Sequence, residues 1–145
     1  MTPSARQRLT ILGATGSIGQ QTLDVVGRHP ERYEVFALTA SSRWQLMAEL
    51  CQTVQPRFAA MSDPAAAVAL RNHLAEAGSQ VEVLSGPTAL ADLAAHPDAD
   101  TVVAAIVGAA GVRPTLAAVE AGKRVLLANK EALVVTGSLF MDAVK

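Results

Sequence analysis

Short apolar runs alternate with amphipathic stretches along this 145-residue chain. The apolar runs predict strands at 9–12, 34–40, 58–61, 81–84, 101–107 and 125–128. The stretches between them predict helices at about 18–28, 44–54, 64–77, 87–95 and 113–122. Strands that are apolar on both faces and separated by helices are typical of a parallel sheet covered on both sides. The sequence therefore predicts one α/β domain with a doubly wound, mostly parallel sheet and helices on both faces.

The first predicted helix carries a stripe of apolar residues. Ile18, Leu23, Val25 and Val26 recur near helical spacing, and His29-Pro30 follows as a stop signal. We expect these four side chains to be buried against the sheet.

Two further segments carry signals about helix ends. Ser62-Asp63-Pro64 resembles an N-cap followed by an early proline, and it predicts a helix that starts at this point. Residues 138–145 have the pattern of a helix, but no glycine or proline ends it. We therefore expect the chain to be one domain of a longer protein.

The composition excludes several classes of protein. Twelve Lys and Arg balance thirteen Asp and Glu, and the net charge of −1 without a basic run argues against nucleic-acid binding. The single cysteine excludes a disulfide framework and a cluster of cysteine metal ligands. The longest apolar run, 102–112, is well short of the ~20 residues that a membrane-spanning helix needs. We expect a cytoplasmic protein.

A glycine-rich segment stands where the first strand becomes the first helix. Gly13, Gly16 and Gly19 have the spacing of a dinucleotide-binding loop, in which the glycines permit a tight turn, approach of a pyrophosphate and close helix packing. Thr15 and Ser17 add hydroxyl groups, and the helix N-terminus adds free N–H groups. A phosphate-binding P-loop is disfavoured because Gly16 is followed by Ser17 and Ile18 and not by Lys and Ser or Thr. The alternative is a turn that only joins strand to helix.

The residues after the second strand bear on the type of dinucleotide. An acidic residue there would bind the ribose hydroxyls of NAD, whereas an arginine suits the 2′-phosphate of NADP. Residues 39–43 read Thr-Ala-Ser-Ser-Arg, with no carboxylate. This chemistry favours NADP, with Ser41, Ser42 and Arg43 as candidate contacts. The alternative is a helix cap by Ser41 or Ser42 with Arg43 in solvent.

Two later segments follow predicted buried strands. The small residues of 104–111 allow close approach of a ligand, but they equally fit a tight turn against a helix. Asn129, Lys130 and Glu131 come directly after the last strand, on the sheet edge where ligands of such folds bind. The alternative interpretation is that these three residues begin a helix, with Asn129 as its N-cap.

Together these segments resemble the 1-deoxy-D-xylulose 5-phosphate reductoisomerase family over essentially the whole chain. The segments that carry the resemblance are 9–19 with 22–26 behind it, Gly86, 104–111, 114–118, 121–123 and 126–134. The resemblance implies an NADPH-dependent enzyme of the non-mevalonate isoprenoid pathway. Such an enzyme rearranges 1-deoxy-D-xylulose 5-phosphate and reduces the product to 2-C-methyl-D-erythritol 4-phosphate, with a divalent metal, Mg or Mn.

The resemblance also implies roles for individual residues. Those that match the NADPH pyrophosphate contacts are Thr15, Gly16, Ser17 and Ile18, and those around the adenosine ribose phosphate are Ser41, Ser42 and Arg43. Those that match the nicotinamide contacts are Asn129 and Glu131, and Lys130 matches a contact of the sugar-phosphate substrate. The cation after the second strand is shifted by one position relative to the family pattern, so its contact with the 2′-phosphate stays open.

The resemblance implies that the parent enzyme binds its cofactor in one domain and its metal and substrate phosphate in other parts. Residues 1–145 match its Rossmann-like NAD(P)-binding domain, whereas its metal-binding carboxylates, flap and phosphate site have no counterpart here. We expect this chain alone to be inactive and the parent to be a homodimer. A sugar epimerase is excluded because Tyr33 is followed by Ala37 and not by the lysine of a Tyr-x-x-x-Lys pair. A stand-alone nucleotide-binding regulatory module is the alternative.

Overall fold

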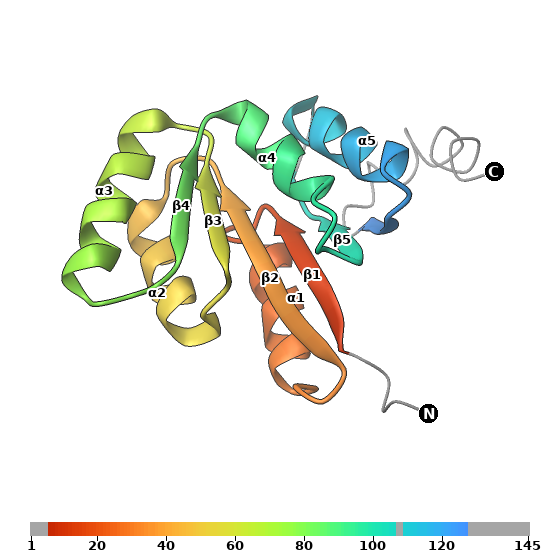
Figure 1. The fold of residues 1–145 in the computed structure, drawn as a ribbon, viewed down its shortest axis with the longest axis horizontal. Helices are drawn as coiled ribbons and strands as arrows, with labels where there is room; N and C mark the ends of the chain where they lie inside the picture. The colour runs from red at the N-terminus through yellow and green to blue at the C-terminus, as the bar shows by residue number, and fades with distance from the viewer. Residues whose placement is uncertain (1–5, 107–108, 128–145) are drawn as a thin grey trace.

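The fold is that of a computed structural model, which describes residues 6–106 and 109–127 (Figure 1). Its strands are β1 (Gln7–Leu12), β2 (Tyr33–Ala40), β3 (Phe58–Met61), β4 (Glu82–Ser85), β5 (Thr101–Ala104) and β6 (Arg124–Leu127). Its helices are α1 (Ser17–Gly27), α2 (Trp44–Val54), α3 (Pro64–Glu76), α4 (Pro87–Ala94) and α5 (Val112–Glu120). A short 3₁₀ turn, Ala109–Gly111, precedes α5.

The six strands form one parallel sheet in the order β4-β3-β2-β1-β5-β6. Helices α1, α2 and α3 lie on one face of this sheet, and α4 and α5 lie on the other (Figure 1). The chain moves outward from β1 to β4, then returns to the far side of β1 to form β5 and β6. The predicted doubly wound α/β fold is confirmed. Its strand order reverses between β1 and β5, and ligands of such sheets bind at this point.

Each face of the sheet has its own apolar core. In β1, Leu9 and Ile11 join the core beneath α1, α2 and α3, whereas Leu12 joins the core beneath α4 and α5. The Thr10 hydroxyl donates a hydrogen bond to the carbonyl of Leu93 in α4, 3.4 Å away. Because successive strand residues point to opposite faces and both faces are covered, the central strands are apolar throughout.

One prediction about the first helix is wrong. Val25 is 52% exposed, whereas Gly19, Leu23 and Val26 are the buried residues of α1 and Ile18 is partly buried. The buried residues follow an i, i+4, i+7 spacing, which keeps them on one side of the helix. Val25 is two positions from Leu23, about 200° around the axis at 3.6 residues per turn, and so faces solvent.

The predicted element boundaries differ from the structure mainly near β5. Helix α2 and strand β3 have the expected bounds, but β5 ends at Ala104 and not at 107. Helix α5 starts at Val112 after a 3₁₀ turn and ends at Glu120, two residues before the predicted end. Residue 128 of the last predicted strand and the predicted helix at 138–145 lie outside the described residues.

The predicted cap of α3 is confirmed. An Asp63 carboxylate oxygen accepts a hydrogen bond from the Ala65 backbone N–H at 3.3 Å, and Pro64 occupies the first turn. The Asp63 N–H also donates to the carbonyl of Ser41, 3.0 Å away. The end of β2 and the start of α3 are thereby joined at the carboxyl edge of the sheet.

Candidate functional site

A cavity of about 490 Å³ opens at the carboxyl ends of the strands, beside the point where the strand order reverses. Its lining is Gly13, Thr15, Gly16, Ala40, Ser41, Ser62, Leu90, Ala105, Ile106, Ala110, Arg113 and Pro114. These residues come from the last residue of β2, from the segments after β1, β2, β3 and β5, and from α4 and α5. The fold therefore brings distant segments to one site.

Two glycines of the loop after β1 are required by the chain itself. Gly13 has φ +84°, and a Cβ there would lie 2.7 Å from the Ala105 carbonyl oxygen. A Cβ at Gly19 would overlap the carbonyl oxygen of Gly13 and lie 2.8 Å from the Ala14 Cα. These positions make the tight turn and the close packing of α1 on the loop.

Gly16 differs from both, because nothing in the described chain requires a glycine there. Its φ is −77°, which any residue adopts, and the nearest atom to an added Cβ is 3.6 Å away. Gly16 also lines the cavity. The missing side chain leaves the loop backbone open to close approach by a ligand.

The loop is held by hydrogen bonds from two directions. Thr39 at the end of β2 accepts the Gly13 N–H at its hydroxyl oxygen (3.3 Å) and the Ala14 N–H at its carbonyl (2.8 Å). The carbonyl of Thr15 accepts hydrogen bonds from the Gln20 amide (3.0 Å) and the Arg43 guanidinium (3.1 Å). The backbone of the loop is therefore fixed before any ligand binds.

The start of α1 suits an anion. The backbone N–H groups of Ser17 and Ile18 donate to no other residue of the described chain. The first turn of α1 contains no acidic side chain. Free N–H groups and the positive end of the helix dipole together attract negative charge, and phosphate above all.

The segment after β2 reaches the cavity through Ser41, whose hydroxyl accepts a hydrogen bond from the Ser62 hydroxyl at 3.3 Å. Neither serine side chain caps α2: the N-cap residue is Arg43, and it makes no side-chain cap bond. The alternative prediction of a serine cap is therefore wrong. The guanidinium of Arg43 turns back to the glycine loop, so Arg43 and Thr15 lie together.

The predicted site residues fall into three groups. Thr15, Gly16 and Ser41 line the cavity, and Arg43 contacts Thr15. The second group lies next to these residues: Ser17 and Ile18 begin α1, and Ser42 lies two residues before the start of α2. The remaining predicted residues, Asn129, Lys130 and Glu131, lie outside the described residues.

Sequence reasoning did not single out several residues that line the cavity. Ser62, Leu90, Arg113 and Pro114 come from segments that the sequence pattern marks only as helix caps, helix starts or core positions. Their presence depends on the strand order, which the periodicity of the sequence does not give. For Ser62, the one available signal was its place at the end of a predicted strand, where side chains reach the carboxyl edge.

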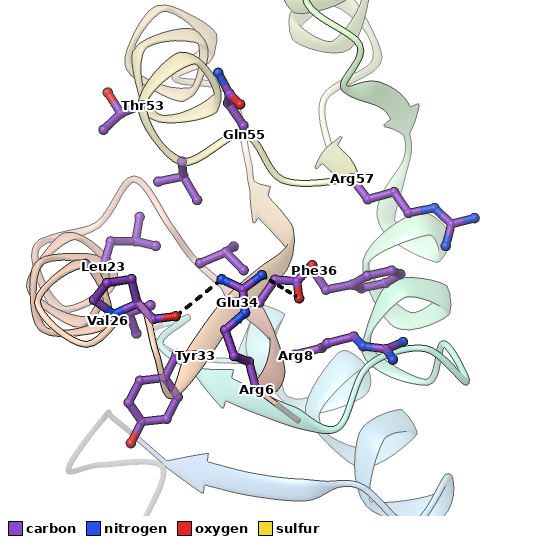
Figure 2. Close-up of a pocket in the computed structure, with 14 residues that line it drawn as sticks. Arg6, Arg8, Leu23, Val26, Tyr33, Glu34, Phe36, Thr53, Gln55 and Arg57 are labelled. Atoms are coloured by element: carbon purple, nitrogen blue, oxygen red, sulfur yellow. Dashed lines mark hydrogen bonds and ion pairs between the residues drawn. The ribbon is translucent and has the colours of Figure 1, made fainter. Parts of the chain in front are cut away.

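A second cavity of about 730 Å³ lies at the opposite, amino edge of the sheet (Figure 2). Arg6 reaches into it and pairs with Glu34 at 3.3 Å, and it also donates to the carbonyl of Pro30. Arg57 on its rim pairs with Asp98 at 2.8 Å. Arg6 and Arg57 thus have carboxylate partners, whereas the guanidinium of Arg8, which also lines this cavity, donates to the carbonyl of Asp98 at 3.3 Å.

Other reactive chemistry is scarce in the part of the chain that the structure describes. Burial raises the pKa of the Cys51 thiol from 9.0 to about 12, so the thiol stays protonated and is not a nucleophile at neutral pH. Within 6–106 and 109–127, no three His, Cys, Asp or Glu side chains gather as a metal site. Among the same residues, no helix is long and apolar enough to cross a membrane.

Comparison with known proteins identifies the family. The family model described as 1-deoxy-D-xylulose 5-phosphate reductoisomerase matches residues 9–137. The chain belongs to this family. The glycine loop, the segment after β2 and the segment after β5 all fall within the matched residues of the reductoisomerase family.

Relatives and solved structures agree with this assignment. A 1-deoxy-D-xylulose 5-phosphate reductoisomerase from Aromatoleum aromaticum is 64% identical, over 99% of this chain and 36% of the relative. One from Ralstonia pickettii is 62% identical, over 95% of this chain and 35% of the relative. The reductoisomerase from Zymomonas mobilis in complex with NADPH has a TM-score of 0.86 at 44% identity, over 97% of this chain and 36% of that chain. This chain thus spans little more than a third of the length of these proteins.

Proposed function

We propose that residues 1–145 are the NADPH-binding domain of a 1-deoxy-D-xylulose 5-phosphate reductoisomerase. The observation that carries the proposal is Gly16, a glycine that the described chain does not need, at the mouth of a cavity beside free helix N–H groups. Solved relatives include a DOX-P reductoisomerase in complex with NADPH, fosmidomycin and magnesium, with a TM-score of 0.87 at 46% identity. A dinucleotide is the ligand that this loop geometry fits best.

Different described residues contact the pyrophosphate and the adenosine end of the cofactor. The pyrophosphate lies over Gly16 and accepts hydrogen bonds from the N–H groups of Ser17 and Ile18, with Thr15 beside it. The adenosine end lies toward Ser41 and Ser42, where Arg43 provides the positive charge for the 2′-phosphate. Among the described residues, no carboxylate lines the cavity, which supports NADP over NAD.

The reaction itself depends on groups beyond those described. Bound NADPH supplies the hydride that reduces the rearranged sugar phosphate to 2-C-methyl-D-erythritol 4-phosphate. By the family resemblance, Asn129 and Glu131 hold the nicotinamide half and Lys130 contacts the substrate. Within the described residues, no three His, Cys, Asp or Glu side chains gather as a metal site. By the family resemblance, the carboxylates that bind Mg or Mn belong to other parts of the parent enzyme. We place the parent enzyme in the cytoplasm as a homodimer.

Charge reversal at Arg43 tests the cofactor assignment. Arg43→Glu removes a guanidinium and places a carboxylate next to the 2′-phosphate. A hydrogen bond to a charged group is worth ~1.5–3 kcal/mol, so NADPH affinity should fall at least tenfold. NADH affinity should fall less, because NADH has no 2′-phosphate. Both are measured by calorimetry at fixed salt, since screening changes exposed charge effects.

The control is Arg32→Glu, an equal charge change just before β2, at the other edge of the sheet. It should leave both affinities unchanged. Equal losses for NADPH and NADH in Arg43→Glu would mean that Arg43 only holds the Thr15 carbonyl. A wild-type chain that binds neither dinucleotide would refute the proposed function.

A further inference from the structure

We infer that Arg113 is a second cation of the dinucleotide site and that its guanidinium binds the diphosphate of the cofactor from the α5 side of the cavity. The inference rests on the proposed function and adds a residue that neither the glycine pattern nor the segment after β2 contains. It makes Arg113 a determinant of affinity for NADPH and NADH alike.

The first support is the charge of the cavity. Among the described residues that line it, Arg113 is the only charged one, and no carboxylate accompanies it. The side chain of Arg113 is exposed. Within 6–106 and 109–127, it forms no ion pair and no hydrogen bond. An uncompensated cation in the wall of a concave site attracts an anion.

The second support is where Arg113 stands in its helix. It is the second residue of α5, and the first turn of α5 contains no acidic residue. A cation at a helix N-terminus opposes the helix dipole. Nothing in the described chain offsets this unfavourable placement, whereas a phosphate in the cavity would interact favourably with both the guanidinium and the dipole. Local placements that lower stability are expected mainly at functional sites.

The third support is the position of the segment after β5, which lies against the glycine loop. The segment between β5 and α5 packs on the glycine loop, since a Cβ at Gly13 would lie 2.7 Å from the Ala105 oxygen and 3.1 Å from an Ile106 side-chain carbon. Arg113 follows this segment on the α5 side and has no partner among the described residues, whereas Arg43 follows β2 and its guanidinium already donates to the Thr15 carbonyl at 3.1 Å. This geometry assigns the diphosphate over the glycine loop to Arg113 and the 2′-phosphate to Arg43.

The two assignments predict different patterns of loss. NADPH and NADH share the diphosphate, so Arg113→Gln should weaken the binding of both by a similar factor, about tenfold for the loss of one charged hydrogen bond. Arg113→Lys keeps the charge and should recover part of the affinity. Binding by Arg113→Gln should also depend less steeply on salt than binding by the wild type.

The experiment is a calorimetric titration of the chain with NADPH and with NADH at two salt concentrations. The matched control is Arg124→Gln, which removes an exposed arginine from the start of β6, at the amino edge, and should leave both affinities unchanged. A thermal melt without ligand separates binding from folding: Arg113→Gln should melt no lower than the wild type, because it removes a cation that opposes the α5 dipole.

Three results would contradict the inference. Unchanged affinity of Arg113→Gln for both dinucleotides would remove Arg113 from the site while leaving the proposed function intact. A loss confined to NADPH would move Arg113 to the 2′-phosphate and end the diphosphate assignment. Wild-type chain that binds neither dinucleotide would refute the proposed function itself and this inference with it.

Discussion

At the scale of single residues, the three glycines of the loop have different physical reasons to be glycine. Gly13 is fixed by its positive φ and by the neighbouring Ala105 carbonyl, and Gly19 is fixed by contact with the loop it packs on. Of the three, only Gly16 has both an ordinary φ and room for a Cβ, whose nearest neighbour would be the Gly13 carbonyl oxygen at 3.6 Å. The spacing in the sequence predicts a tight turn, the approach of a pyrophosphate and close helix packing. The backbone geometry shows that Gly13 forms the turn and that Gly19 allows the packing.

Gly16 and Gly19 should therefore respond differently to an added side chain. Gly16→Val should abolish most NADPH binding, because the branched side chain occupies the space of the pyrophosphate. Its effect on the free energy of unfolding should be ~1 kcal/mol or less, the difference between good and poor N-cap residues. Gly19→Ala should destabilise the fold by ~1–3 kcal/mol, since its Cβ forces the loop backbone to move.

Urea denaturation and calorimetry of the two variants check this contrast. A folded Gly16→Val protein with wild-type NADPH affinity would show that the loop is only a turn. A Gly19→Ala protein as stable as the wild type would show that the loop can shift at little cost.

At the scale of elements, local signals predicted boundaries well where they describe the backbone directly. The cap formed by Asp63 and Pro64 correctly marked the start of α3. The extent of β5 was predicted from apolarity alone, and that prediction was too long. Ala105 and Ile106 are apolar, but they lie beyond the end of β5 and line the cavity, although the Ala105 N–H still donates to the Leu12 carbonyl at 2.9 Å. Apolarity cannot tell a residue buried in a sheet from one that forms the wall of a ligand site.

The cap of α3 offers a test at this scale. Asp63→Ala removes the acceptor for the Ala65 N–H and should lower the free energy of unfolding by ~1 kcal/mol. Asp63→Asn keeps a side-chain acceptor and should remain close to the wild type. Both are measured by urea denaturation. A loss as large in Asp63→Asn as in Asp63→Ala would show that the carboxylate charge, and not the cap bond, stabilises this end of the helix.

At the scale of the whole molecule, the strand order creates the site. Ser41, Ser62, Leu90 and Arg113 are far apart in the sequence and line one cavity because their segments meet at the carboxyl edge of a single sheet. Hydrophobic periodicity predicts which segments are strands and helices, but not the sheet order that makes them neighbours. For this reason the glycine loop could be predicted in detail and the segment 104–111 as one of two alternatives, whereas Ser62, Leu90 and Arg113 could not be predicted as cavity residues.

A ligand that binds only the assembled cavity must stabilise the whole fold. NADPH at 100 times its dissociation constant should raise the free energy of unfolding by ~2.7 kcal/mol. For a domain of this size, that corresponds to a rise in melting temperature of roughly 5–10 °C. Mg²⁺ without NADPH should leave the melting temperature unchanged, because the described residues gather no set of metal ligands. Gly16→Val is the control, since it should keep the fold and lose the NADPH shift. A rise with Mg²⁺ alone would place a metal site within this chain, and an equal NADPH shift in Gly16→Val would place the dinucleotide outside the cavity.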